Sequence, residues 1–342
     1  MTPLGRRVRS ACLSMLGWAM LATGAVAPAW GAPDEPPQTT RAAEDLWTGD
    51  FAALDSRNAA LRESGAMTAE GRPELLMFRN GIRNVIGHQA KPREPYIREL
   101  EELTLQWTRQ YPQSALAHIL HARVLVEHGW SYRGGSFASK VSPQQMVQFE
   151  RYLRQALEYL KMHGEVALTD SYAHLTLLEI GRALGFQRKH MESIVQDGLK
   201  RNPRDMELYF EVGTSLLPKW GGDAQALDKY IRQVATQTRS QYGAGMYGWM
   251  YSSAALGQYQ HGLFKDTLAE WPLIQQGYED ILERYPDAVG RRNRYAYFAC
   301  MAQDKATLQE QLAKIGTGLK ISEWGDNGER SLEGCQRLAN EI

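Results

Sequence analysis

Apolar residues recur at intervals of three and four along most of the chain, which is the period of an α-helix with one buried face. Between Leu75 and Ile86 the stripe includes Phe78, Ile82 and Val85, and comparable stripes follow toward the C-terminus. Nowhere do apolar and polar residues alternate as they do in a half-buried β-strand. The pattern therefore predicts an all-α fold.

Proline turns divide these stripes into helical pairs. Tyr111-Pro112, Asn202-Pro203 and Tyr285-Pro286 each end one predicted helix and precede another, because proline cannot continue a helix. Repeats of the tetratricopeptide type close each pair of helices in this way. The joints are unevenly spaced, so we expect an α-α superhelix of degenerate tetratricopeptide-like helical hairpins. A non-repetitive helical bundle is the alternative.

One joint, from Glu207 to Asp223, combines all of these signals. Leu217-Pro218 ends a helix, Trp220 precedes the Gly221-Gly222 pair that lets the backbone reverse, and Asp223 is the predicted N-cap of the next helix. This joint is where one helical pair meets the next. Further N-caps are predicted at Asp50, Ser114 and Ser142, the last of these within a capping box.

Residues 1–31 have the composition of a signal peptide. A basic start is followed by an uncharged apolar run from Ala11 to Val26, and Ala29 and Gly31 place small residues where signal peptidase cleaves. We expect cleavage after Gly31, a periplasmic or secreted location and no stable membrane insertion afterwards. An N-terminal membrane anchor is the alternative, because the apolar run approaches the ~20 residues that span a bilayer.

The remaining chain is predicted to contain a flexible proline-rich leader at residues 32–45 and a single helical-repeat domain at residues 46–342. Of the three cysteines, Cys12 falls within the signal peptide, which leaves Cys300 and Cys335. In an oxidising compartment these two can form one disulfide. Two separately buried thiols are the alternative.

Charge and motifs narrow the function classes. The chain has 39 basic and 39 acidic residues and a net charge of +0, so no overall field attracts nucleic acid or an acidic membrane. No Gly-x-Ser-x-Gly, no Ser-x-x-Lys and no phosphate-binding glycine loop occurs in the sequence. We expect no nucleic-acid partner and no cofactor, and we favour a binding protein over an enzyme.

Two joints carry an aromatic and a basic residue beside glycines: Trp130 with Arg133, and Lys219 with Trp220. In a helical-repeat array such joints lie along one surface, so we expect these four residues to line a common pocket for a peptide, a glycan or an acidic group. In the alternative, each Trp fills the gap between neighbouring hairpins, and each basic side chain binds the carbonyls at a helix C-terminus.

Three histidines, His118, His121 and His128, fall within about a quarter-turn of one another on one predicted helix. Their spacing lacks the carboxylate or cysteine partners of a zinc motif, so we expect no metal. We expect these histidines to be either partly exposed on the hairpin or hydrogen-bonded at its packing face. A hydrolase that uses His118, His121 and nearby carboxylates is the alternative function.

A second basic group, Arg291, Arg292 and Arg294, opens a predicted helix near the C-terminus. Positive charge at a helix N-terminus opposes the helix dipole. We interpret the group as a solvated turn that pairs with acidic neighbours, with contact to an anion or an acidic partner as the alternative. The expected acidic neighbour is Asp280, Glu283 or Asp287.

Short motifs over most of the chain, from about Leu46 to Trp324, occur in a recognisable combination. They are Tyr111-Pro112-Gln113-Ser114 with Ala117 and Ala122, Gly129-Trp130, Arg133-Gly134, Leu216 to Gly222, Trp271 with Tyr285-Pro286, and Phe298 to Asp304. Together they resemble a bacterial family catalogued as domain of unknown function 4034. Lys219 departs from the family pattern, in which arginine is more usual. The resemblance implies a helical, tetratricopeptide-like body and supplies no catalytic residues.

These observations predict an exported, non-catalytic binding or scaffold module. Its expected partner is a protein, a peptide or an envelope polymer such as a glycan.

Overall fold

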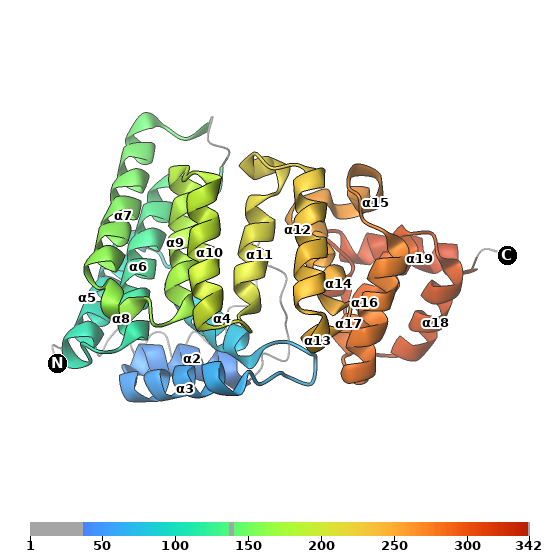
Figure 1. Cartoon of the computed structure of the whole chain (residues 1–342), viewed down its shortest axis with the longest axis horizontal. Helices are drawn as coiled ribbons and strands as arrows, with labels where there is room; N and C mark the ends of the chain where they lie inside the picture. Colours follow the sequence, from blue (N-terminus) through green and yellow to red (C-terminus); the bar gives the residue numbers. More distant parts are fainter. Residues whose placement is uncertain (1–36, 137–139, 341–342) are drawn as a thin grey trace.

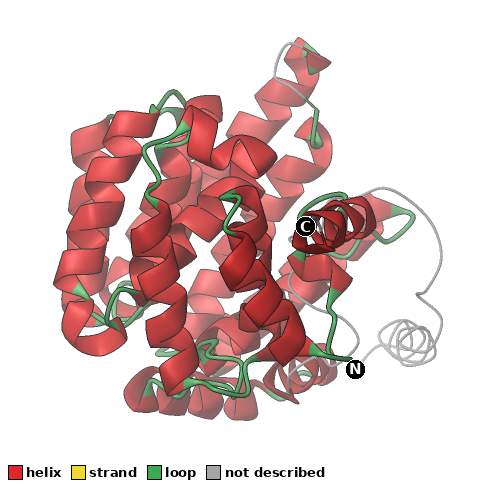
Figure 2. Ribbon diagram, turned by 90° about the vertical axis from the view of Figure 1, so that its right-hand side faces the viewer, coloured by secondary structure: helices red, strands yellow, loops and turns green. Residues whose placement is uncertain are grey.

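The computed structural model describes residues 37–136 and 140–340, and these ranges form helices packed in sequential pairs (Figure 1). Seen from the side, the described part of the chain contains helices and loops without a β-strand (Figure 2). The all-α prediction is therefore confirmed. The predicted signal peptide at residues 1–31 lies outside the described residues, so cleavage after Gly31 and the anchor alternative stay predictions.

Twelve-residue α2 is the first described element, and the helices then follow with mostly short connections. The N-terminal half contains α2 (Pro37–Thr48), α3 (Phe51–Ser64), α4 (Glu74–Ile86), α5 (Arg93–Gln110), α6 (Ala115–Arg133), α7 (Pro143–Met162), α8 (Gly164–Ala167), α9 (Ser171–Leu184) and α10 (Arg188–Arg201). The C-terminal half contains α11 (Met206–Ser215), η2 (Pro218–Trp220), α12 (Ala224–Gln237), α13 (Arg239–Tyr242), α14 (Gly245–Ala254), η3 (Ala255–Tyr259), η4 (Gln260–Gly262), α15 (Leu263–Asp266), α16 (Trp271–Arg284), α17 (Val289–Met301), α18 (Lys305–Ile315), η5 (Ile321–Glu323) and α19 (Gly328–Asn340).

The predicted N-caps are confirmed. The side chains of Asp50, Ser114, Ser142 and Asp223 each accept the backbone N–H three residues further on, at 2.7 to 3.3 Å. Gln145 completes the capping box at the start of α7. A side-chain oxygen at this position satisfies a backbone donor that the helix cannot pair, so these four helices begin where the sequence predicts.

Residues 37–45 correct one prediction, because they belong to α2 and not to a flexible leader. Thr39 and Ala42 are buried, and the Thr39 hydroxyl donates to the carbonyl of Met77 in α4 at 3.1 Å. Gly81 permits this close approach, since a Cβ there would lie 2.1 Å from the Thr39 carbonyl oxygen. The contact with α4 explains why a segment with few apolar residues is helical.

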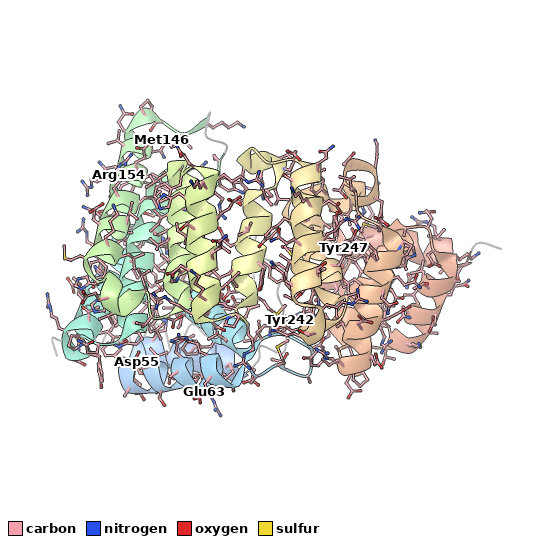
Figure 3. The ribbon with its side chains drawn as sticks, in the orientation of Figure 1. Asp55, Glu63, Met146, Arg154, Tyr242 and Tyr247 are labelled. Carbon is pink, nitrogen blue, oxygen red and sulfur yellow. A yellow bond between two sulfur atoms is a disulfide. The ribbon has the colours of Figure 1, made fainter. Side chains whose placement is uncertain are left out.

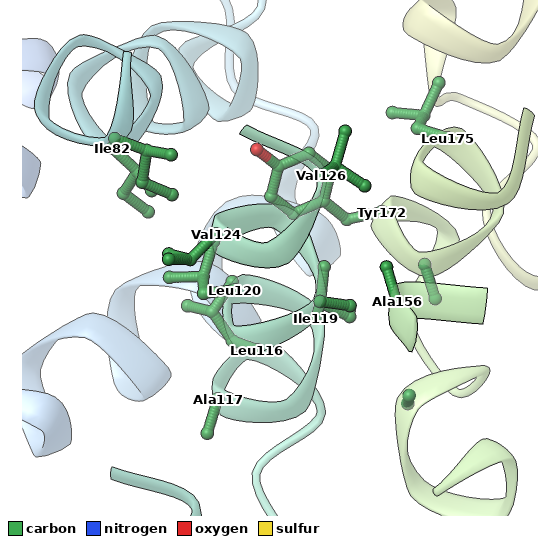
Figure 4. Close-up of a cluster of buried hydrophobic side chains, with 14 of the residues drawn as sticks. Ile82, Leu116, Ala117, Ile119, Leu120, Val124, Val126, Ala156, Tyr172 and Leu175 are labelled. Atoms are coloured by element: carbon green, nitrogen blue, oxygen red, sulfur yellow. The ribbon is translucent and has the colours of Figure 1, made fainter. Parts of the chain in front are cut away.

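Two large apolar cores support the two halves of the molecule. In the first core, Leu116, Leu120 and Val124 of α6 pack near Ile82 of α4 and Tyr172 of α9 (Figure 4). The second core joins α11 and α12 to α14, α16 and α17. A smaller third cluster, built around a buried Trp324, holds α17, α18 and α19 together.

The connection between α3 and α4, residues 65–73, is called the crossing segment here because it reaches the C-terminal half. The Glu70 carboxylate accepts the backbone N–H of Gly290 at 2.9 Å and the ammonium of Lys320 at 2.8 Å. Arg72 pairs with Glu323 at 3.3 Å. In Figure 1 this segment runs below α11 and α12, so two parts of the chain that are distant in sequence lie in contact.

Candidate functional site

A groove of about 630 Å³ lies between the α9–α10 pair and the α11–α12 pair. We call it the inter-hairpin groove. Helix α11 lies between α10 and α12 in Figure 1 and supplies residues to the lining. The apolar lining comes from Leu178, Met191, Val195, Leu199, Val212 and Leu216, and the polar groups include Arg182, Glu211, Tyr209, Tyr230, Gln233 and Gln237.

Trp220 reaches this groove because of the joint that the sequence singled out. Pro218 starts the short η2 turn that carries Trp220, and Gly222 then packs so closely that a Cβ would lie 2.0 Å from the Leu216 carbonyl oxygen. The Asp223 cap begins α12 directly afterwards. The joint therefore holds the Trp220 side chain at the groove with 38% of its surface exposed.

An ion pair lies beside Trp220 within the groove. Arg182 of α9 binds the carboxylate of Glu211 of α11, and its guanidinium carbon lies 4.8 Å from the centre of the Trp220 ring. A guanidinium at this position is attracted by the aromatic face. Burial raises the pKa of the Glu211 carboxyl, and the charge of Arg182 offsets this only in part. The groove thus contains an aromatic face, a cation and an acid in one small area.

Tyr230 adds an unpaired polar group to the lining. Its hydroxyl is buried and has no hydrogen-bond partner among the described residues. Burial raises the pKa of the Tyr230 phenol, so the hydroxyl remains a donor. A buried hydroxyl without a partner is unfavourable, and a bound molecule with a suitably placed acceptor would satisfy it.

Lys219 is held by the neighbouring turn and does not line the groove. Its ammonium donates to the carbonyl of Gly257 at 2.7 Å, and its backbone N–H donates to Gln258 at 3.0 Å. Burial lowers the pKa of Lys219, and the nearby Arg182 lowers it further. Lys219 therefore attaches η2 to η3 through a backbone carbonyl, which agrees with the alternative that the basic side chain has a structural role.

Trp130 and Arg133 lie elsewhere, at the C-terminal end of α6. Trp130 packs edge-on against Phe149 of α7 with ring centres 4.8 Å apart. The guanidinium carbon of Arg133 lies over the Trp130 ring, 5.0 Å from its centre. Arg133 also donates to the carbonyls of Gly134 and Ser136. Neither residue lines the inter-hairpin groove, so the structure does not bring the two joints into one pocket.

The three histidines are buried and hydrogen-bonded where α6 packs on its neighbours. His118 bonds to the Tyr159 hydroxyl at 2.9 Å, and His121 bonds to the Thr104 hydroxyl at 3.0 Å. Burial lowers the pKa of His121 to about 4. Residues 37–136 and 140–340 contain no group of three or more metal-ligating side chains placed to hold a metal.

His128 differs from the other two histidines because it lies between two carboxylates. Its ring nitrogens contact Glu101 and, at 2.8 Å, Glu94, and its side chain is fully buried. Burial alone would lower the pKa of His128, but the hydrogen bonds to these carboxylates outweigh it and raise the pKa. His128 therefore links α5 to α6 through two carboxylates.

Cys300 and Cys335 form a disulfide that ties α17 to α19, which decides between the two alternatives left open by the sequence. Disulfides are typical of proteins in oxidising compartments outside the cytosol. No helix within the described ranges is long and apolar enough to cross a membrane.

The basic group at the start of α17 is not the solvated turn that we expected. Arg294 is buried and pairs with Glu323 at 2.9 Å. Arg292 donates to the side chain of Gln311 and the carbonyl of Pro286. Arg291 binds backbone carbonyls of the crossing segment. The predicted pairing with Asp280, Glu283 or Asp287 is therefore wrong. Helix α17 instead directs the three arginine side chains toward the crossing segment, η5 and α18.

No family model, curated protein or solved structure matches this chain. The family resemblance accordingly stays a prediction, and function has to be argued from the site. Sequence reasoning singled out Trp220 but missed Arg182, Glu211 and Tyr230. These three residues stand on three different helices, and no local motif marks them.

Proposed function

We propose that this protein is a non-catalytic binding module that holds a segment of polypeptide in the inter-hairpin groove. The observation that carries the proposal is the combination of a partly exposed Trp220, the Arg182–Glu211 pair beside it and the unpartnered Tyr230 hydroxyl, all lining one groove. Binding sites for small ligands and peptides are concave, mostly apolar and fitted with a few polar groups that set orientation.

A polypeptide suits the lining better than a polymer of sugars. The apolar residues of α9, α10 and α11 offer area for an apolar side chain, and the amides of Gln233 and Gln237 can both donate to and accept from a peptide backbone. Arg182 already covers one face of Trp220, which leaves less of the ring free for stacking on a sugar. Arg182 and Glu211 would select charged groups of opposite sign along the peptide.

We further propose that the helical pairs form an α-α superhelix of degenerate tetratricopeptide-like hairpins and that the chain belongs with the bacterial family it resembles. The proline joints and the sequential pairing of helices support this proposal. We propose export to the periplasm or beyond, which the signal-like residues 1–31 and the Cys300–Cys335 disulfide support.

The hydrolase alternative draws no support from the histidines. His118 and His121 are engaged in hydrogen bonds inside the packing of α6, and neither lines the groove. A general base has to reach a substrate, and these rings face the core.

Trp220→Ala separates a binding role from a packing role. Because Trp220 is 38% exposed, we expect the variant to lose less than about 1 kcal/mol of unfolding free energy, against the ~3–5 kcal/mol typical of a buried aromatic residue. Peptides selected from a random displayed library on the wild-type protein should lose most of their affinity for Trp220→Ala, measured by titration calorimetry. Glu211→Gln should change which charged peptides are selected.

Trp130→Phe is the matched control, since Trp130 belongs to the other joint and does not line the groove. It should retain peptide binding. Equal peptide affinity in wild type and Trp220→Ala would refute the groove as the site. Binding of soluble glycan fragments in place of peptides would refute the polypeptide assignment.

A further inference from the structure

A second cavity lies where the crossing segment meets both halves of the molecule. It has a volume of about 70 Å³ and is lined by residues of α3, α4, the crossing segment, α11, α13, α14 and α17. Tyr242, labelled in Figure 3 near the lower end of α12, is one of the lining residues. A single water needs roughly 10–15 Å³ of cavity volume, so the cavity has room for several waters or one small ion.

The unpaired polar atoms of this cavity are all donors. Three buried lining atoms lack a hydrogen-bond partner among the described residues: Nε of Arg62, Nε of Arg79 and the indole Nε1 of Trp249. Trp249 is 4% exposed and Arg79 is 0% exposed, so neither group is satisfied by bulk solvent. Buried donors without acceptors are unfavourable, which indicates that an acceptor belongs in the cavity.

The charges around the cavity also indicate an acceptor. Four arginines line it, Arg62, Arg79, Arg204 and Arg291, against two acids, Asp205 and Glu207. Both acids are already paired, since Arg79 binds Asp205 at 2.9 Å and Glu207 at 2.8 Å, and Glu207 also binds Arg83 at 2.5 Å. Asp170, which lies next to the lining, binds Arg62 at 3.4 Å and Arg79 at 3.5 Å. Arg204 and Arg291 therefore remain as lining cations without an ion pair to a carboxylate of the described chain.

Of these two cations, Arg204 is exposed and Arg291 is half-buried. The Arg291 guanidinium donates to the carbonyls of Glu70 and Gly71 at 3.2 and 3.3 Å and makes no ion pair with a carboxylate of the described chain. It also lies 5.1 Å from the centre of the Trp249 ring, which carries one of the unpaired donors. Burial lowers the pKa of Arg291 to about 10, and the nearby charge of Arg72 contributes.

We propose that this cavity binds a small oxyanion, a carboxylate or phosphate group, between Arg291, Arg79 and the indole N–H of Trp249. An oxyanion offers acceptors only, which matches a lining whose unpaired atoms are donors. The volume limits the occupant to one such group, either a free ion or the end of a larger molecule. Since Arg79 belongs to α4 and Trp249 and Arg291 belong to α14 and α17, the bound anion joins the two halves of the protein.

The test uses the full mature chain with two probes, inorganic phosphate and acetate, at constant ionic strength set by chloride. The indole ¹H–¹⁵N signal of Trp249, assigned by its loss in Trp249→Phe, should shift and saturate with one or both probes. The melting temperature should rise over the same concentration range, because a ligand that binds only the folded state stabilises it. A lower Kd for phosphate or for acetate identifies which group the cavity prefers.

Arg291→Gln removes the positive charge and Trp249→Phe removes the indole donor, and each should weaken anion binding at least about tenfold. Arg292→Gln is the matched control, because Arg292 is the next residue of α17 but does not line the cavity, and its affinity should equal that of wild type. If Arg291→Gln fails to fold, Arg291→Lys keeps the charge and should retain a weaker saturable response. An indole signal insensitive to both probes, or equal affinity in Arg291→Gln and wild type, would overturn the proposal.

Discussion

At the scale of single residues, protonation and folding are coupled most directly at His128. Its pKa is raised in the folded protein by Glu101 and Glu94, so the charged form is stabilised by folding. That stabilisation is complete below the unfolded pKa of about 6.5 and is lost as the pH rises through the higher folded pKa. His121 has the opposite behaviour, because its folded pKa of about 4 means that folding favours the neutral ring. Its contribution to the free energy of unfolding is complete above the unfolded pKa of about 6.5 and is lost as the pH falls toward about 4.

We expect His128→Gln to lose about 1–3 kcal/mol of unfolding free energy near pH 6 and clearly less near pH 9, because the charged pair with two carboxylates exists mainly in the acid range. Urea denaturation at constant ionic strength, followed by circular dichroism, measures both values. His190→Gln is the control, since His190 is an exposed residue of α10 without an ion pair in the described chain. A loss that does not change with pH would contradict the assignment.

The candidate site shows what residue-level sequence reasoning can predict and what it cannot. Trp220 was predictable because an aromatic residue between a proline and two glycines is a local signal. Arg182 and Glu211 were not, because their side chains meet only after α9 and α11 pack, and their sequence positions are 29 residues apart. Arg291 carried a local signal, the wrong charge for a helix N-terminus, but the sequence could not show which groups it faces.

At the scale of elements, helix starts were predictable and helix α2 was not. Asp50, Ser114, Ser142 and Asp223 are N-caps because the side chain and the donor it satisfies are three residues apart. Helix α2 escaped prediction because its stability depends on a tertiary contact: Thr39 and Ala42 bury against α4 at Gly81. The apolar period within residues 37–48 is too sparse to indicate a helix by itself.

Gly81→Ala tests whether α2 depends on that contact. A methyl group at this position would collide with the backbone of α2, so we expect α2 to separate from α4 at a cost of about 1–3 kcal/mol. Urea unfolding gives the loss of stability, and limited proteolysis should show faster cleavage within residues 37–48. Gly135→Ala is the control, because a Cβ there would meet nothing within 4 Å. Unchanged proteolysis in Gly81→Ala would show that α2 is held by other contacts.

At the scale of the whole molecule, the crossing segment joins two cores that otherwise lie in sequence order. Glu70 and Arg72 bind the C-terminal half at Gly290, Lys320 and Glu323, and the proposed anion would lie beside these contacts. The protein should therefore unfold as one cooperative unit although its helices pack in sequential pairs.

The double variant Glu70→Ala, Arg72→Ala removes the charged contacts of the crossing segment. We expect it to lose about 2–4 kcal/mol and to replace a single calorimetric transition by two overlapping ones, because each core then unfolds more independently. Differential scanning calorimetry measures the number of transitions. Glu63→Ala is the control, since the exposed Glu63 of α3 is labelled at the lower edge of Figure 3, away from the C-terminal half. A single sharp transition in the double variant would show that the apolar cores alone couple the halves.

The crossing segment also has a consequence for the order of folding. A stack of neighbouring helical pairs has low contact order, and such chains form structure progressively as they are synthesised or emerge from a membrane channel. The bond from Glu70 to Gly290 spans 220 residues, so the crossing segment cannot dock until α17 has emerged. Until then the second core lacks Met67 as a partner, and the last helices to appear complete a structure that the first helices began.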